Sequence, residues 1–236
     1  MNFFYTDTQQ QFHTQSQALD PLPGTQKEIE SIGALLQKQG WKVETYTQQN
    51  ALEEVIKSVK NPEVLHIATH GFFEPDQVVA QSDQVSDEPP SLEDPMLRSG
   101  LYFAGANRTL AKAAKTDLED GVMTAFESTG LNLQGTELVV LSACETGMGH
   151  IRSGEGVFGL QRAMQEAGAN AVLMSMWSVP DKETQELITM FYAKWLSGRS
   201  KHEALHEAQL ELRKETIAKW GDDRPHYWAA FVLVGR

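Results

Sequence analysis

The sequence predicts an α/β protein with a mostly parallel sheet flanked by helices on both faces. Short apolar runs typical of buried strands, at residues 64–68, 138–143 and 171–175, alternate with segments of helical periodicity about ten to fifteen residues long. Strands separated by helices in this way run parallel, and right-handed crossovers distribute the helices over the two faces of the sheet.

The composition fits a soluble globular chain. Of the 236 residues, 41% are hydrophobic and 22% are charged, and no apolar stretch approaches the length of a membrane helix. The N-terminus lacks a secretory signal and a lone cysteine is typical of a reducing compartment, so we expect a cytoplasmic protein without a membrane partner. The net charge of -12 argues against direct nucleic-acid binding and favours basic peptides, unless it serves solubility alone.

The chain is expected to have two parts. Residues 1–20 are polar and rich in glutamine without periodicity, which is typical of a polar tail or a linker remnant. Residues 21–236 carry the periodic segments and are expected to form one domain. Within that domain, the acidic residues 74–95 contain two consecutive prolines and no Lys or Arg, which predicts a long exposed loop.

The first half of the domain follows a β-α-β order. Thr25 followed by Glu28 has the spacing of a capping box, and apolar positions at helical intervals then continue until Gly40. The next elements predicted are a strand at 41–46, a helix at 51–59 and the strand at 64–68.

The second half continues the alternation. Ser200 followed by Glu203 again has the spacing of a capping box and predicts the start of a long helix. In chain order we expect a strand or hairpin arm at 101–104, a short helix at 122–128, a strand at 138–143, a helix at 157–166, a strand at 171–175, a helix at 182–196, a helix at 200–219 and a last apolar strand at 229–235.

Two reactive side chains stand where buried strands end. His70 closes the run VLHIATHG, and Cys144, the only cysteine, closes the run ELVVLSAC. Because ligands of parallel sheets bind beyond the carboxyl ends of the strands, both residues are expected on one rim. A thiol needs a base to become a nucleophile, and the backbone amides of Gly71 and Cys144, each in a glycine-bearing turn, are candidate donors to an oxyanion.

Simpler interpretations exist for each residue. A free cysteine is usually a small buried apolar residue, and a single histidine is usually a hydrogen-bonded core residue. Their joint placement at two strand ends favours the catalytic interpretation. His66 and His70 alternate to the same side of a strand, but no further ligand completes a zinc set, so neither a metal nor a cofactor is expected.

Five ordered blocks resemble the CHAT family of caspase-like cysteine peptidase domains, which is related to caspases and separase. They are VLHIATHGFF, DPMLRSGLYFAGAN, TELVVLSACETGMG, GEGVFGLQRAMQEAGANAVLMSMWSVPD and HYWAAFVLVG. The resemblance implies a caspase-hemoglobinase fold and a catalytic dyad in which His70 is the base and Cys144 the nucleophile. It also implies that the amides of Gly71 and Cys144 hold the oxyanion.

The substrate-binding residues are less specific. The segment WSVPD is similar to separase, which implies that Asp181 contacts a basic P1 side chain; helix capping is the alternative role. Glu145 could face the same pocket or lie solvated in a turn. Trp177 could line the pocket or belong to the core.

These residues lead to three functional hypotheses. The first is a cysteine endopeptidase that cleaves proteins after Arg or Lys. The resemblance implies regulated proteolysis by a domain of a larger bacterial signalling or defence protein, with a sensor or tetratricopeptide-repeat region as partner. The second is a catalytically silent CHAT-like interaction module. The third is a thiol-dependent acyl hydrolase or transferase that acts on small molecules.

Overall fold

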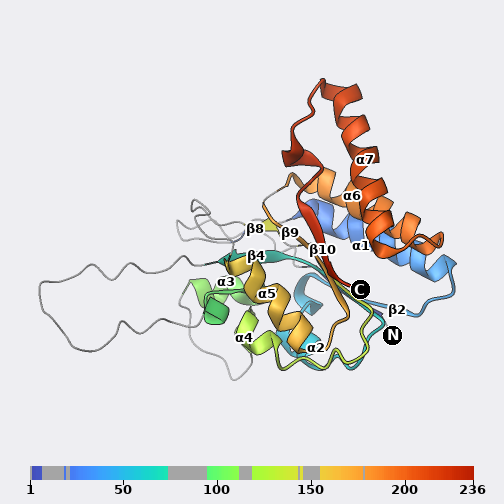
Figure 1. Ribbon diagram of the computed structural model, residues 1–236. Coiled ribbons are helices and arrows are strands. Elements are labelled where there is room, and N and C mark those ends of the chain that lie inside the picture. Colours follow the sequence, from blue (N-terminus) through green and yellow to red (C-terminus); the bar gives the residue numbers. More distant parts are fainter. Residues whose placement is uncertain are drawn as a thin grey trace, which may run out of the picture.

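A six-stranded sheet with the order β10-β9-β7-β3-β1-β2 forms the centre of the fold (Figure 1). The computed structural model describes residues 2–6, 19, 22–73, 95–111, 119–142, 144–145, 155–177 and 179–236. The strands are β1 (Asn2–Thr6), β2 (Val43–Thr47), β3 (Val64–Ala68), β7 (Leu138–Leu141), β9 (Ala171–Ser175) and β10 (Phe231–Gly235). All neighbours pair in parallel except β10, which runs antiparallel to β9, so the predicted mostly parallel sheet is confirmed.

A smaller sheet continues the central one beyond its carboxyl edge. Its order is β6-β5-β4-β8, and its strands are β4 (His70–Phe73), β5 (Ser99–Tyr102), β6 (Val122–Thr124) and β8 (Cys144–Glu145). Only Thr69 separates β3 from β4, and Thr69 Oγ1 donates a 2.5 Å hydrogen bond to the carbonyl oxygen of Tyr102 on β5. The neighbouring strands β3 and β7 thus lead directly into the strands β4 and β8.

Helices cover both faces of the central sheet. They are α1 (Pro23–Lys38), α2 (Glu53–Lys57), α3 (Ala106–Leu110), α4 (Ala125–Ser128), α5 (Glu155–Glu166), α6 (Asp181–Leu196) and α7 (Lys201–Trp220), with short 3₁₀ turns η1 (Gln48–Asn50), η2 (Pro95–Leu97) and η3 (Pro225–Tyr227). Helices α1, α6 and α7 pack on one face, and α2 and α5 on the other. Among the described residues, no helix is both long and apolar enough to cross a bilayer.

Two hydrophobic cores explain why the central strands are continuously apolar. Along β3, Val64 and Ala68 pack into the core beneath α1 and α6, whereas Leu65 and Ile67 pack into the core beneath α2 and α5. Successive side chains of a strand point to opposite faces, so a sheet covered on both sides needs apolar residues at nearly every position.

The expected tail at residues 1–20 is wrong for Asn2–Thr6. These residues form β1, which pairs with β2 on one side and β3 on the other. The run NFFYT contains three aromatic residues that favour strands, but five residues are too few to show a period beside a glutamine-rich segment. Residues 7–18 lie outside the described part of the chain, as do residues 74–94 of the expected acidic loop.

Two local predictions also need correction. Helix α1 has Leu22 as its N-cap and no side-chain cap, so the capping box expected from Thr25 and Glu28 does not form. The short helix expected at 122–128 begins only at Ala125, because the first three residues form β6, and Thr124 with Glu127 makes the capping box there. The box expected at Ser200 and Glu203 is confirmed at the start of α7.

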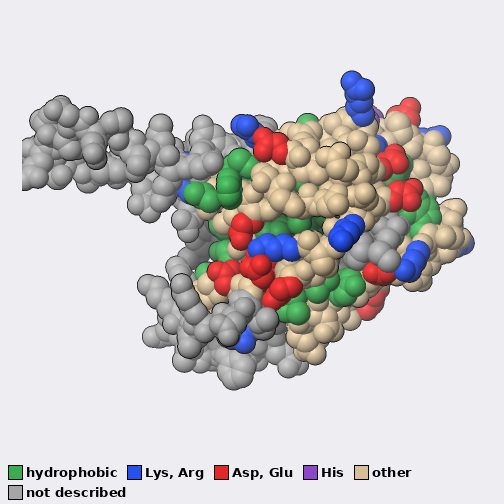
Figure 2. All heavy atoms as spheres, turned by 90° about the horizontal axis from the view of Figure 1, so that it is seen from below, with side chains coloured by type: hydrophobic (Ala, Val, Ile, Leu, Met, Phe, Trp, Pro, Cys, Tyr) green, Lys and Arg blue, Asp and Glu red, His purple; other side chains and the backbone are tan. Residues whose placement is uncertain are grey.

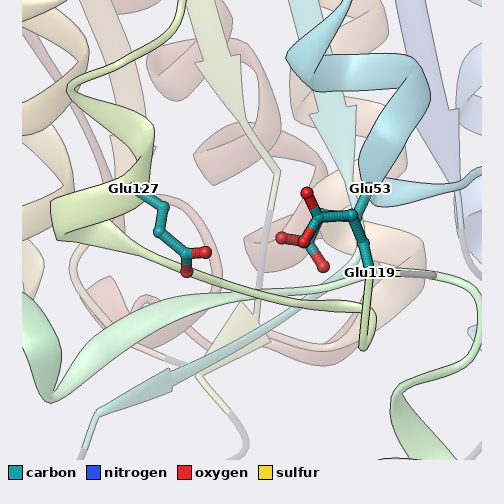
Figure 3. A group of neighbouring side chains, drawn as sticks. All are labelled: Glu53, Glu119 and Glu127. Carbon is teal, nitrogen blue, oxygen red and sulfur yellow. The ribbon is translucent and has the colours of Figure 1, made fainter. Parts of the chain in front are cut away.

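A cluster of charged side chains around Lys57 joins α2 to α4. Lys57 Nζ lies 2.6 Å from Glu53, 3.1 Å from Glu119 and 3.2 Å from Glu127, and Figure 3 shows these three glutamates. Burial raises the pKa of Glu53, against the hydrogen bond from Lys57. Burial also opposes the charge on Lys57, but hydrogen bonds to the three carboxylates outweigh it and raise the pKa of Lys57.

Removal of the central cation should destabilise the fold. Lys57→Met leaves Glu53, whose side chain is 1% exposed, without its counter-ion. We expect a loss of about 2–4 kcal/mol in the free energy of unfolding near neutral pH, below the range for a fully buried pair because Lys57 is partly exposed. Urea unfolding followed by tryptophan fluorescence measures this loss. The exposed Lys60, changed to Met, is the matched control and should cost less than about 0.5 kcal/mol.

The same experiment has a pH dependence of known sign. In the wild type, burial raises the pKa of Glu127, but hydrogen bonds from Thr124 and Lys57 outweigh this effect and the pKa is lowered overall. The ionised Glu127 therefore stabilises the fold, and this stabilisation is lost as the pH falls below the usual pKa of 4.5. In Lys57→Met, mutual repulsion raises the carboxyl pKa values, so its cost is relieved as the pH falls. The difference between the proteins should therefore shrink toward about pH 4.5, and a constant difference would contradict the ion-cluster interpretation.

Candidate active site

The candidate residues gather along the carboxyl rim of the central sheet. The strands β9, β7 and β3 are consecutive and parallel, and their carboxyl ends precede Trp177 and Asp181, then Cys144, then His70. Residues far apart in the sequence therefore stand in a row at one edge. This is where parallel sheets bind ligands.

His70 and Cys144 are register partners on adjacent strands. His70 is the first residue of β4 and is 3% exposed, and Cys144 is the first residue of β8. The strands β4 and β8 pair in parallel with His70 opposite Cys144 and Gly71 opposite Glu145. Because paired strands lie about 4.8 Å apart, the two candidate residues are backbone neighbours.

The turns expected at these positions are replaced by strands. Gly71 and Cys144 were predicted to lie in glycine-bearing turns, yet Gly71 lies inside β4 and pairs with Leu101 of β5 as well as with Glu145. The sequence pattern did not reveal this because β8 has only two residues. The backbone of Glu145 accordingly lies in a strand rather than in a turn.

Asp181 is engaged with another helix. It is the first residue of α6, Pro180 is the N-cap, and no side chain caps this helix, so capping of its own helix is not the role of Asp181. The backbone N–H of Gly24, in the first turn of α1, instead donates a hydrogen bond to Asp181 Oδ2. A Cβ atom at residue 24 would collide with this carboxylate. Gly24 therefore permits the close approach of α1 to Asp181.

Trp177 joins the rim to the chain before β10. Its indole Nε1–H donates a 3.1 Å hydrogen bond to the carbonyl oxygen of His226 in η3. Its ring is partly buried and packs against the core beneath α1 and α6. The ring is thus at least in part a core aromatic, located beside the rim.

A buried polar network that the sequence patterns did not predict lies below the rim. His66 Nε2 lies 2.8 Å from Glu28 Oε1, and His66 Nδ1 lies 3.1 Å from the hydroxyl of Tyr192. Ser142 Oγ donates a 3.1 Å hydrogen bond to the other carboxylate oxygen, Glu28 Oε2. All four side chains are buried, with Glu28 1% exposed. The one available signal was His66 within an apolar run, because a buried imidazole requires polar partners.

One arrangement of protons gives every hydrogen bond of this network a donor and an acceptor. Burial, and then the charge of Glu28, raises the pKa of Tyr192 well above its usual value, so its hydroxyl keeps its proton. That hydroxyl can donate to His66 Nδ1, which leaves His66 Nε2–H to donate to Glu28. The carboxylate then accepts from His66 and Ser142, and each bonded group has a matching role.

The acidic cluster around Lys57 does not offer an open metal site. The carboxylate oxygens of Glu53, Glu119 and Glu127 lie within 4.8 Å of one another and are the one such group found in the described ranges. However, the ammonium group of Lys57 bonds to all three carboxylates and neutralises the charge that would attract a cation.

On the face drawn in Figure 2, Lys and Arg side chains are scattered among acidic ones rather than gathered into a basic patch.

Solved structures with a similar fold include a cysteine proteinase. The Arg specific cysteine proteinase gingipain R matches with a TM-score of 0.52 and 9% identity, over 99% of this chain and 46% of the other. The complex of the Porphyromonas gingivalis RgpB pro- and mature domains matches with a TM-score of 0.54 and 8% identity, over 99% of this chain and 47% of the other. The expected caspase-hemoglobinase-like α/β fold is therefore confirmed.

Curated relatives are long proteins of which this chain matches a small part. Tetratricopeptide repeat protein 28 of Homo sapiens is 27% identical over 229 residues, which are 91% of this chain and 8% of that protein. Its counterpart in Mus musculus is 30% identical over 118 residues, which are 50% of this chain and 5% of that protein. A family model described as the CHAT domain matches residues 5–236, and the chain belongs to the CHAT domain family, as its sequence blocks predicted.

Proposed function

We propose that this chain is the peptidase domain of a cysteine endopeptidase, with Cys144 as nucleophile and His70 as base. The observation that carries the proposal is the register pairing of His70 with Cys144 on adjacent parallel strands. In-register partners project to the same side of a sheet, which is the arrangement that a base and its nucleophile require. The cysteine peptidase-like fold supports the same chemistry.

The reaction would proceed in two stages. His70 accepts the proton of the Cys144 thiol, and the thiolate attacks the carbonyl carbon of the scissile peptide bond. The amides of Gly71 and Cys144 hold the oxyanion, and His70 gives its proton to the departing amine as the C–N bond breaks. Water, deprotonated by His70, then hydrolyses the thioester, and the thiol recovers its proton. This scheme needs no cofactor or metal.

We further propose that substrates carry Arg or Lys at P1 and that Asp181 recognises this side chain. The carboxylate accepts from Gly24 through Oδ2, which leaves Oδ1 for a cation. Trp177 and Glu145 are further candidates for the pocket, Trp177 from its place beside the rim and Glu145 from its place opposite Gly71. A fold neighbour described as Arg specific supports this preference.

The relatives support a domain within a longer protein that contains tetratricopeptide repeats. Regulated proteolysis by such a protein is part of the proposal. The bacterial defence setting implied by the resemblance gains no support from relatives of Homo sapiens and Mus musculus. A silent interaction module within such a repeat-containing protein is the alternative to the peptidase.

The dyad can be tested by covalent labelling. We expect an electrophilic peptide that ends in Arg to add to Cys144, with a mass shift that Cys144→Ser abolishes and that His70→Ala slows by about 10²- to 10⁴-fold. Intact-mass spectrometry is specific because Cys144 is the only cysteine. If neither an Arg-ending nor an Asp-ending peptide reacts while a small neutral alkylating agent still modifies Cys144, the peptidase proposal is wrong and the interaction module is favoured.

The role of Asp181 can be tested separately. Asp181→Asn should lower kcat/KM for an Arg substrate by about 100-fold and reduce discrimination against a neutral P1 residue, because it removes the charge but keeps an oxygen that can accept from Gly24. Glu186→Gln removes the same charge from the same helix and should leave kcat/KM within about twofold. Equal losses in the two variants would point to a general charge effect and contradict a pocket role.

A further inference from the structure

We propose that Glu28 is a positioning residue that fixes the spacing between His70 and Cys144, an inference that rests on the proposed function. The carboxylate projects from α1 to the central sheet and contacts two neighbouring strands at once. Oε1 bonds to His66 on β3, and Oε2 bonds to Ser142, which follows β7.

Each contacted residue lies a few positions before a candidate catalytic residue. His66 stands four positions before His70, and Ser142 stands two positions before Cys144. Ser142 also donates its backbone N–H to the carbonyl oxygen of Ile67 on β3, at 2.9 Å. The side-chain bond to Glu28 thus adds a second restraint at the point where the chain passes from β7 to β8.

The support behind Glu28 is stiff. Tyr192 of α6 holds the other nitrogen of His66, at 3.1 Å, and α1 packs against α6 in the same core. Gly24, one turn before Glu28 on α1, is bonded to Asp181 at the start of α6. The helix that carries the carboxylate is therefore held against α6, which restrains Glu28 when either strand shifts. Restraint of this kind is what keeps reacting groups within a fraction of an ångström of a productive geometry.

The two strands depend on Glu28 in different ways. The strand β3 is paired on both sides, with β1 and β7, whereas the two-residue β8 has β4 as its one partner within the described part of the chain. Loss of the Ser142 bond should therefore displace Cys144 more readily than His70. Substrate binding should change little, because Asp181 and Trp177 follow a different strand, β9, and these changes leave the contact between Gly24 and Asp181 in place.

The test uses Ser142→Ala and Glu28→Gln, with Ser142→Thr as the conservative variant that keeps a hydroxyl. We expect Ser142→Ala and Glu28→Gln to lower kcat on an Arg peptide by about 10- to 100-fold with KM within about twofold, and Ser142→Thr to recover most of the rate. Ser128→Ala is the matched control, because Ser128 is also a buried serine and the change removes its hydroxyl bond to the carbonyl oxygen of Thr124, the N-cap of α4. It should leave kcat unchanged.

Alkylation of Cys144 as a function of pH provides a readout independent of peptide cleavage. In the wild type, His70 should hold the midpoint below the usual thiol value of about 8.5, and His70→Ala should raise it. Ser142→Ala and Glu28→Gln should raise it as well, while urea unfolding confirms that the variants are folded. If Glu28→Gln does not fold, Ser142→Ala decides the matter alone.

The outcomes separate the two proposals. Midpoints and kcat values of Ser142→Ala that match the wild type, while His70→Ala shifts the midpoint, would overturn the positioning role and leave the dyad intact. A fall in kcat equal to that of Ser128→Ala would overturn it too, since a general loosening of the core would then explain the loss. A midpoint that His70→Ala does not move would overturn the dyad itself and the inference with it.

Discussion

The pairing of β3 with β7 is the constraint on which the candidate site depends. These strands are in register, with His66 opposite Val140, and each is buried on both faces of the sheet. Beyond β3 and β7, the chain forms the short parallel strands β4 and β8, which pair with each other. The relative position of His70 and Cys144 is thus inherited from a sheet held between two hydrophobic cores. A pair held in this way needs no long-range loop to bring its members together.

The polar network around Glu28 lies inside one of those cores, but it differs in energy from the apolar packing around it. A buried carboxylate is costly unless it is hydrogen-bonded, and among the residues that the structure describes His66 and Ser142 together supply the hydrogen bonds of Glu28. If one partner is lost, the desolvation cost of the other groups remains. The network therefore contributes little net stability for its size, but it penalises any displacement of β3 relative to the end of β7. Specificity of geometry is its physical consequence.

The accuracy of the predictions from sequence depended on how far apart the interacting residues are along the chain. Strand 171–175 was predicted to the residue and the long helices to within a few residues, because apolar periodicity is local. Glu28 was assigned to a capping box because Thr25 stands three residues before it, whereas its partner His66 is 38 residues away. The contact of Asp181 with Gly24 spans 157 residues. No local pattern encodes either contact.

Helix α1 consequently links Asp181 to Glu28, two residues whose connection no sequence pattern predicts. Its first turn holds the carboxylate of Asp181, and the next turn carries Glu28, which reaches the strands before His70 and Cys144. A cation bound to Asp181 would have to share that carboxylate with the backbone of Gly24, so recognition of a substrate would act on the same helix that braces the strands. The close approach that permits this requires a glycine at position 24, because any Cβ would displace the carboxylate.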